Sequence, residues 1–246
     1  GFVKLIQHRE IPDDHIIKSV TITKTRTNKY YISILVEYET QVIKKDIEKV
    51  IGLDFSMKEL YVDSNGYSAK YPRFFRQAQE KLAKQQRIFS HRKPGSKRYE
   101  KQRLKVAKIH EHISNQRKDF LHKESHRLSD TYDMVCVEDL NMQAMSQCLN
   151  FGKSVSDNGW GMFITFLKYK LEDQGKQLFV IDKWFPSSKM CSVCGCINKE
   201  LTLVDREWCC DCGANHNRDH NAAINIRNFG IRTVGITGVA QGCLCQ

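Results

Sequence analysis

The sequence lacks any long hydrophobic run, any recognisable export signal, any low-complexity tract and any evident internal repeat. Because a helix needs about 18 apolar residues to cross a bilayer, we expect no membrane-spanning helix. The chain starts with Gly1-Phe2-Val3-Lys4 and not with Met, so we expect the natural N-terminus to lie further upstream. With 41% hydrophobic and 10% aromatic residues, the chain can bury one full-sized core or two modest ones.

Acidic residues are in the minority, with 28 Asp and Glu against 39 Lys and Arg and a formal net charge of +11. Such an excess is typical of proteins that bind polyanions, and it favours nucleic acid as the partner. Residues 73–128 alone hold 17 Lys and Arg against 5 Asp and Glu, in a pattern that predicts two basic helices separated at Pro94-Gly95. The aromatic residues of this region could stack on bases or belong to the core: Phe74, Phe75, Phe89 and Tyr99.

Ten cysteines are present, and six of them lie between positions 191 and 212. Clustered pairs in a chain without an export signal favour metal ligands over disulfides. Two matching spacings, Cys191-x2-Cys194 and Cys209-x2-Cys212, predict a structural Zn²⁺ site with four thiolates. Cys196 and Cys210 each adjoin a predicted ligand, and we expect them to be free or to lie beside the metal site. Cys243 and Cys245, near the C-terminus, have no predicted role.

Hydrophobic alternation predicts strands in several parts of the chain. Residues 16–22 and 30–36 form a predicted hairpin, and residues 49–54, 60–63 and 67–69 form three successive antiparallel strands around an Asn65-Gly66 turn. Further strands are predicted at residues 134–137 and 177–181, and helices near 157–173 and 219–227. This order predicts an α/β fold whose mixed sheet carries helices on its faces.

Three carboxylates occupy separate places in this predicted topology. Asp54 and Glu138 each follow a buried-type strand, and Asp219 begins a predicted helix. Since uncompensated charges at neighbouring strand ends would repel, we expect a cation between them. Such hard oxygen ligands suit Mg²⁺ or Mn²⁺, and a two-metal site of this kind cuts phosphodiesters. Arg218 could contact the scissile phosphate, or it could be a structural ion-pair partner.

Four strings of the sequence stand out by their order and spacing. They are Ile51-Gly52-Leu53-Asp54, Val137-Glu138-Asp139-Leu140-Asn141, Phe185-Pro186-Ser187-Ser188-Lys189-Met190-Cys191-Ser192-Val193-Cys194-Gly195 and Asn217-Arg218-Asp219-His220-Asn221-Ala222-Ala223-Ile224-Asn225-Ile226. With these strings the sequence resembles a known family, the TnpB-type proteins of bacterial insertion sequences, which are also called OrfB transposases and are related to type V CRISPR nucleases. The resemblance covers essentially the whole chain.

This resemblance implies an RNase H-like (RuvC) nuclease domain with a helical insertion and an inserted zinc ribbon. Asp54, Glu138 and Asp219 would be its catalytic carboxylates, and DNA would be cut at a site chosen by a guide RNA. The implied boundaries are a C-terminal hairpin of an upstream β-domain at 1–45, nuclease segments at 46–185 and 217–246, and the ribbon at 186–216. Most of the N-terminal lobe of the family would be missing, and the protein would be cytoplasmic and nucleoid-associated in a bacterium.

One alternative from a different class stays open on the sequence alone. The chain could be a non-catalytic accessory protein of transposition that is stabilised by zinc and binds DNA or RNA through its basic helices. The arrangement of the three carboxylates separates the two hypotheses, because a nuclease needs them close enough for two ions about 3.5–4 Å apart.

Overall fold

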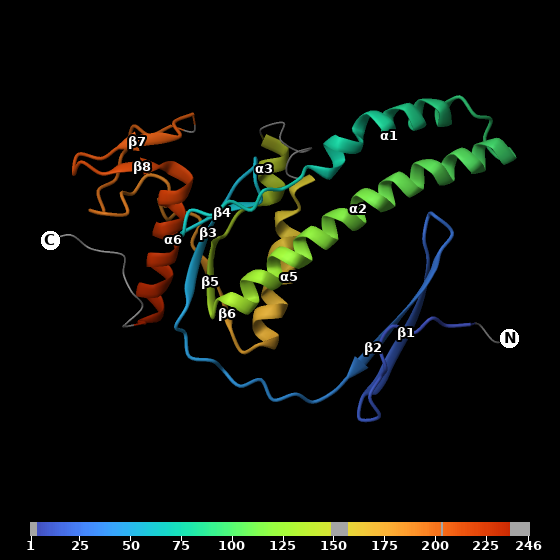
Figure 1. Cartoon of the computed structure of the whole chain (residues 1–246), viewed down its shortest axis with the longest axis horizontal. Coiled ribbons are helices and arrows are strands. Elements are labelled where there is room, and N and C mark those ends of the chain that lie inside the picture. The colour runs from blue at the N-terminus through green and yellow to red at the C-terminus, as the bar shows by residue number, and fades with distance from the viewer. Residues whose placement is uncertain (1–3, 149–156, 203, 237–246) are drawn as a thin grey trace. The chain divides into compact units, whose positions relative to one another are not determined.

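The computed structural model describes residues 4–148, 157–202 and 204–236, which places Cys243 and Cys245 outside the described residues (Figure 1). The chain divides into two compact units. One unit consists of Gly1–Gln41 and Lys81–His112, and the other consists of Val42–Glu80 and Ile113–Gln246. Within the described residues, no helix is long and apolar enough to cross a membrane.

The first unit contains the predicted hairpin. Strands β1 (Ile16–Lys24) and β2 (Tyr30–Glu37) pair antiparallel and are rich in β-branched and aromatic residues, as expected for strands. Asn28 adopts a positive φ of 63° in the turn between them, a conformation that asparagine tolerates well. The hairpin therefore forms where the sequence predicts it.

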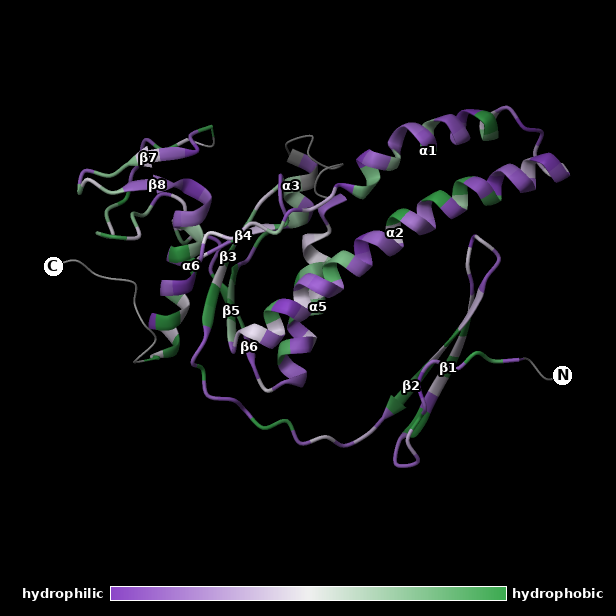
Figure 2. Cartoon of the chain, in the orientation of Figure 1, coloured by the Kyte–Doolittle hydropathy of each residue, from purple (hydrophilic) through white to green (hydrophobic). Residues whose placement is uncertain are grey.

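Two long helices lie on either side of the predicted break at Pro94-Gly95: α1 (Phe74–Ser90) before it and α2 (Lys97–Thr131) after it. Both are mainly hydrophilic, as the purple colouring in Figure 2 shows. Within the first unit, the rings of Phe89 and Tyr99 pack at 4.6 Å between centroids, so these two aromatics hold the helices together. In the second unit, Phe74 packs edge-on against Tyr71 and contributes to the core.

The second unit is built on a mixed sheet of four strands in the order β4-β3-β5-β6. The strands are β3 (Val50–Phe55), β4 (Tyr61–Asp63), β5 (Met134–Glu138) and β6 (Gln177–Ile181). β3 pairs antiparallel with β4 and parallel with β5, which pairs parallel with β6. The third antiparallel strand predicted at 67–69 is reduced to a single bridge between Val62 and Ser68. The predicted mixed sheet is thus confirmed.

Helices cover the two faces of this sheet (Figure 1). Alternate residues of each strand point to opposite faces. Ile51, Leu53 and Val137 pack into a core with α5 (Trp160–Asp173) and with Leu121 and Leu128 of α2. On the opposite face, Val50, Met134 and Cys136 pack against Ile226 and Ile231 of α6 (Arg218–Val234). We call these the α5 face and the α6 face.

The helix α6 can lie close to the sheet because a glycine stands at each of two contacts, Gly52 on strand β3 and Gly230 on α6 itself. A Cβ atom added to Gly52 of β3 would lie 2.2 Å from the carbonyl oxygen of Ala223, and one added to Gly230 would lie 2.4 Å from Cys136 Sγ. The start of α6 is fixed by Asn217, whose side chain accepts a hydrogen bond from the His220 backbone N–H. These contacts determine where the first turn of α6 lies over the sheet.

Two further parts of the second unit complete the fold. The short helix α3 (Met142–Cys148) follows β5. The cysteine-rich segment between β6 and α6 contains a small antiparallel pair, β7 (Glu207–Cys209) and β8 (Asn215–Asn217), and β8 runs directly into α6. The cysteine-rich segment is therefore attached to the α6 face of the sheet.

Candidate functional site

Asp54 and Glu138 project from neighbouring parallel strands on the α6 face. Leu53 of β3 pairs with Val137 of β5, so the residues that follow them lie side by side at the same edge of the sheet. Asp54 lies two positions after Gly52, and Glu138 lies two positions after Cys136, and both of these earlier residues face α6. Because strand side chains alternate between faces, the side chains of Asp54 and Glu138 also point to the α6 face. Asp54 is buried, with 8% of its surface exposed.

Asp219 reaches the same region from the first turn of α6. Its carboxylate accepts hydrogen bonds from two arginines: Arg218 Nη2 lies 3.1 Å from Oδ1, and Arg206 Nη1 lies 3.3 Å from Oδ2. The Arg218 side chain is 13% exposed and that of Arg206 is 61% exposed. Arg218, which the sequence left between a phosphate ligand and an ion-pair partner, is an ion-pair partner in this structure.

The charges around Asp54 bear on its ionisation. Burial raises the pKa of Asp54 well above its usual range, and the nearby charges of Glu138 and Asp219 raise it further. Arg218 and Arg206 act in the opposite direction, because their positive charges favour the ionised carboxylate. Each of these groups is therefore near enough to Asp54 to influence its ionisation.

Glu138 has a neutral hydrogen-bond partner. Burial raises the pKa of Glu138, and the hydroxyl of Ser187, which donates to Glu138 Oε1, opposes this rise. Ser187 is itself buried and lies in the loop between β6 and the first cysteine pair. The sequence gives Ser187 no individual role, because its partner lies 49 positions away in the chain.

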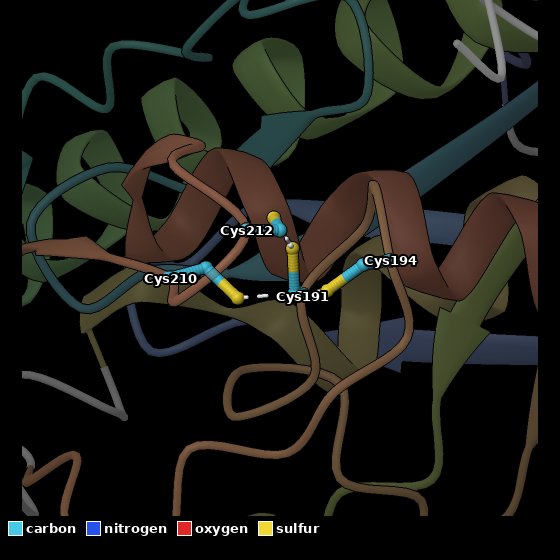
Figure 3. Close-up of side chains that lie close together, drawn as sticks. All are labelled: Cys191, Cys194, Cys210 and Cys212. Carbon is cyan, nitrogen blue, oxygen red and sulfur yellow. Dashed lines mark hydrogen bonds between the residues drawn. The ribbon is translucent and has the colours of Figure 1, made fainter. Parts of the chain in front are cut away.

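The cysteine-rich segment contains a compact group of four sulfur atoms, from Cys191, Cys194, Cys210 and Cys212, whose side chains point toward one another (Figure 3). All four lie within 4.8 Å of one another; Cys191 and Cys212 are 3.8 Å apart, and Cys194 and Cys210 are 3.5 Å apart. A tetrahedral zinc with bonds of about 2.3 Å spaces its sulfur ligands by about 3.8 Å, so the group has the size of a one-metal site.

The structure corrects one member of the predicted set, because Cys210 and not Cys209 contributes the third sulfur. Cys209 is the last residue of β7, and its sulfur is 3.5 Å from the Cys210 carbonyl oxygen. The turn after it is closed by hydrogen bonds from Cys210 N to Ala214 O and from Gly213 N to Cys210 O. The turn therefore starts one residue later than the matching spacing predicts.

Polar residues of the neighbourhood support the sulfur group. His216 of β8 is buried, and its Nε2 lies 3.0 Å from Cys191 Sγ. The backbone N–H of Cys196 lowers the pKa of Cys194 to about 6, which favours the thiolate that a metal needs. Asn221 of α6 accepts from Ser192 N and donates to Met190 O, on either side of Cys191.

The sequence signal for these supporting residues is weak but present. Asn221 and Asn225 are polar residues four positions apart on an otherwise apolar helix face, and both are buried. Buried amides must find hydrogen-bond partners, so this pattern indicates a polar loop packed against α6. The pattern identifies the helix face, but it does not identify the loop.

Comparison with known proteins gives matches over most of the chain. The family model OrfB_IS605, described as "Probable transposase", matches residues 33–149, and the model of the Cas12f1-like TNB domain matches residues 160–226. A "Putative RNA-guided DNA endonuclease" of Streptomyces pristinaespiralis is 37% identical over 91% of this chain and 55% of that protein. A protein of Escherichia coli strain K12, "Putative RNA-guided DNA endonuclease InsQ", is 30% identical over 92% of this chain and 59% of that protein.

A solved structure shows the same fold. The chain aligns with a cryo-EM structure of a Cas12f1-sgRNA-target DNA complex with a TM-score of 0.55 and 18% identity, over 89% of this chain and 68% of that one. The RNase H-like (RuvC) mixed sheet with a helical insertion and an inserted four-cysteine segment is thereby confirmed. The chain spans a little over half the length of the relatives from Streptomyces pristinaespiralis and Escherichia coli. Over most of its length the chain is therefore similar to the TnpB/OrfB proteins of insertion sequences.

Proposed function

We propose that this chain carries the nuclease domain of a transposon-encoded, RNA-guided DNA endonuclease, with Asp54, Glu138 and Asp219 as its catalytic residues. The observation that carries this proposal is the placement of the three carboxylates: Asp54 and Glu138 stand at neighbouring strand ends on the face that α6 covers, and Asp219 lies in the first turn of α6. The charges of Glu138 and Asp219 both raise the pKa of the buried Asp54. In a protein that only binds nucleic acid, repulsion among three carboxylates would lower stability without serving a purpose. In a site that binds cations, the same negative charges attract the ions, and the bound ions offset the repulsion.

The donor set fits divalent ions. Carboxylate oxygens are the ligands that Mg²⁺ and Mn²⁺ prefer, and two such ions supply a polarised water and a stabilised leaving oxygen in phosphodiester cleavage. Two ions about 3.5–4 Å apart accommodate carboxylates that approach from two neighbouring strand ends and from the start of a helix.

The residues of the chain have separate tasks in this scheme. Asp54 and Glu138 approach from the sheet and Asp219 approaches from α6, so ions would be held between a strand edge and a helix start. Arg218 and Arg206 screen Asp219 in the present structure. With ions bound to the carboxylates, we expect these guanidinium groups to bind the phosphate of a DNA strand instead.

We assign the cysteine group to a structural Zn²⁺ held by Cys191, Cys194, Cys210 and Cys212. Four thiolates at tetrahedral spacing leave no position for a reacting water, which favours a structural over a catalytic role. The metal would fasten a segment whose strands, β7 and β8, have only three residues each. Such short strands add little stability without a cross-link.

DNA and a guide RNA are the proposed partners. The names of the relatives include RNA-guided DNA endonucleases, and the matched solved structure is a complex with an sgRNA and target DNA. The basic residues of 73–128 would bind phosphates without reading bases. We retain the domain boundaries at 1–45, 46–185, 186–216 and 217–246, and a cytoplasmic, nucleoid-associated location, as parts of this proposal.

The direct test is a cleavage assay with Mg²⁺ on single- and double-stranded DNA, with and without RNA co-expressed from the transposon end. Glu138→Gln should abolish cleavage and leave DNA binding nearly unchanged. Asp139→Asn is the matched control, because Asp139 is the next residue and is exposed, so it should cleave normally. Equal cleavage by Glu138→Gln and wild type would overturn the catalytic assignment, and tight DNA binding without any cleavage would favour the accessory-protein alternative.

A further inference from the structure

Ser187 has an environment that a loop serine seldom has. Only 4% of its surface is exposed, although it lies in the polar loop that leads to the first cysteine pair. Its hydroxyl donates to Glu138 Oε1, at the end of strand β5. Since buried hydroxyls and carboxylates both need hydrogen-bond partners, each of these two groups satisfies the other.

The backbone of Ser187 is held from the opposite side, by α6. Asn225 Nδ2 donates to Ser187 O at 2.8 Å and to Met190 O at 2.6 Å, and Asn225 is 2% exposed. One turn earlier, Asn221 Nδ2 donates to the same Met190 carbonyl at 2.7 Å. The loop between Ser187 and Met190 is thereby tied to the helix that also begins with Asp219.

This arrangement matters because a glutamate carboxylate is not fixed by its backbone. Three torsions separate the carboxylate of Glu138 from β5, and each can adopt more than one rotamer. The hydrogen bond from Ser187 holds Oε1 and so restrains the torsions of the Glu138 side chain. Partners of this kind orient metal-binding carboxylates in many sites, and their loss typically costs about 10- to 100-fold in metal affinity or activity.

We infer that Ser187 is a positioning residue for Glu138, and that Asn225 holds Ser187 in place, so that α6 sets the positions of both Glu138 and Asp219. This inference rests on the proposed function, because it assumes that Glu138 binds a divalent ion. It adds two residues outside the carboxylate set, Ser187 and Asn225, whose effect is transmitted through Glu138.

The test is Mn²⁺ binding to the zinc-loaded full chain, measured by the electron paramagnetic resonance signal of free Mn²⁺, beside the Mg²⁺ dependence of cleavage. Ser187→Ala should weaken Mn²⁺ binding and raise the half-saturating Mg²⁺ concentration by about 10-fold. Ser187→Thr keeps the hydroxyl and should restore both values to within about 2-fold of wild type. Ser188→Ala is the matched control, as the neighbouring serine, and should behave as wild type.

A second pair of variants separates positioning from general loss of structure. Asn225→Ala frees the Ser187 carbonyl and should weaken Mn²⁺ binding, whereas Asn221→Ala, which loosens only the Met190 and Ser192 contacts, should affect it less. The positioning role would be wrong, and the proposed metal site would stand, if Glu138→Gln bound Mn²⁺ weakly while Ser187→Ala and Asn225→Ala bound it as tightly as wild type. Unchanged Mn²⁺ binding in Glu138→Gln would instead overturn the proposed metal site.

Discussion

The two faces of the central sheet are built on opposite principles. The α5 face is filled by large apolar side chains, among them Leu53, Phe163 and Leu167, all fully buried. The α6 face has a smaller apolar core, and it holds Gly52, Gly230, two buried asparagines and the carboxylates of Asp54 and Glu138. The α5 face therefore gains stability from hydrophobic burial, while the α6 face gives up part of this gain to bring charged groups and α6 close together.

The first way to sharpen this comparison is to remove one charge from the α6 face. Asp54→Asn keeps the shape of the side chain and removes its repulsion with Glu138 and Asp219. Cleavage should fall by more than about 100-fold, since a ligand of the proposed divalent ions is lost. Because the fold disfavours the ionised form of Asp54, metal-free Asp54→Asn should also be more stable at pH 7, by about 0.5–2 kcal/mol.

The measurements are the cleavage rate and the urea midpoint of the metal-free protein. The sign follows from the raised pKa of Asp54, since a carboxyl whose folded pKa is raised is less stable as a charged group in the fold than in the unfolded chain. A matched variant on the α5 side is Asp157→Asn, where Arg117 makes a buried ion pair with the carboxylate. That variant should lose stability. Destabilisation by both variants would contradict the view that the α6 face is strained by its charges.

A second prediction breaks the close approach of α6. Gly52→Ala puts a methyl group against the backbone of Ala223, which cannot move without shifting the helix. We expect a loss of about 3 kcal/mol or more in the free energy of unfolding, together with loss of cleavage, because Asp219 moves with α6. Leu167→Ala on the α5 face should cost a similar amount, about 2–5 kcal/mol, and leave the carboxylates in place.

Thiol labelling distinguishes these two variants. Cys136 is buried next to Gly230, and burial raises the pKa of its thiol to about 12, so labelling should be slow in wild type. Displacement of α6 in Gly52→Ala should speed up labelling of Cys136, whereas Leu167→Ala should leave its rate nearly unchanged under native conditions. Equal labelling in both variants would show that the two faces respond alike.

A third prediction concerns the cysteine-rich segment. Structural zinc sites with four ligands contribute about 10–16 kcal/mol, so loss of one ligand should weaken zinc binding by roughly 100-fold or more. Cys210→Ser should show this loss, and Cys209→Ser should retain zinc with nearly wild-type affinity. Competition with a chromophoric chelator measures both. If Cys209→Ser lost zinc and Cys210→Ser kept it, Cys209 would be the ligand, as the matching spacings predict.

The sequence predicts different parts of this molecule to different extents. The strands β3, β5 and β6 and the helices α1, α2, α5 and α6 are predicted, because their hydrophobic patterns are local. The places of Asp54, Glu138 and Asp219 follow from strand ends, a helix start and the family strings. Cys210 is missed because the turn is set by the pairing of β7 with β8, and not by the cysteine spacing.

Contacts between distant residues are also missed, and they share a physical cause. Two such contacts are the hydrogen bond from Ser187 to Glu138 and the close approach of Ala223 to Gly52. Each joins elements far apart in the chain, so no local sequence pattern predicts it. The sequence shows only one half of each contact, such as a glycine in a buried strand. The partner becomes evident only when the register of β3 with β5 and the position of α6 are known.

The smallest predicted effect is at His216, which links the sulfur group to β8. Its Nε2 lies 3.0 Å from Cys191 Sγ, and its ring packs on Trp208 at 4.7 Å between centroids. His216→Phe keeps the ring contact and removes the polar one, so zinc affinity should fall by about 10-fold. Trp208→Phe is the matched control and should leave zinc affinity unchanged. Equal affinities for His216→Phe and wild type would mean that His216 contributes packing alone, and that the sulfur group depends only on its own four side chains.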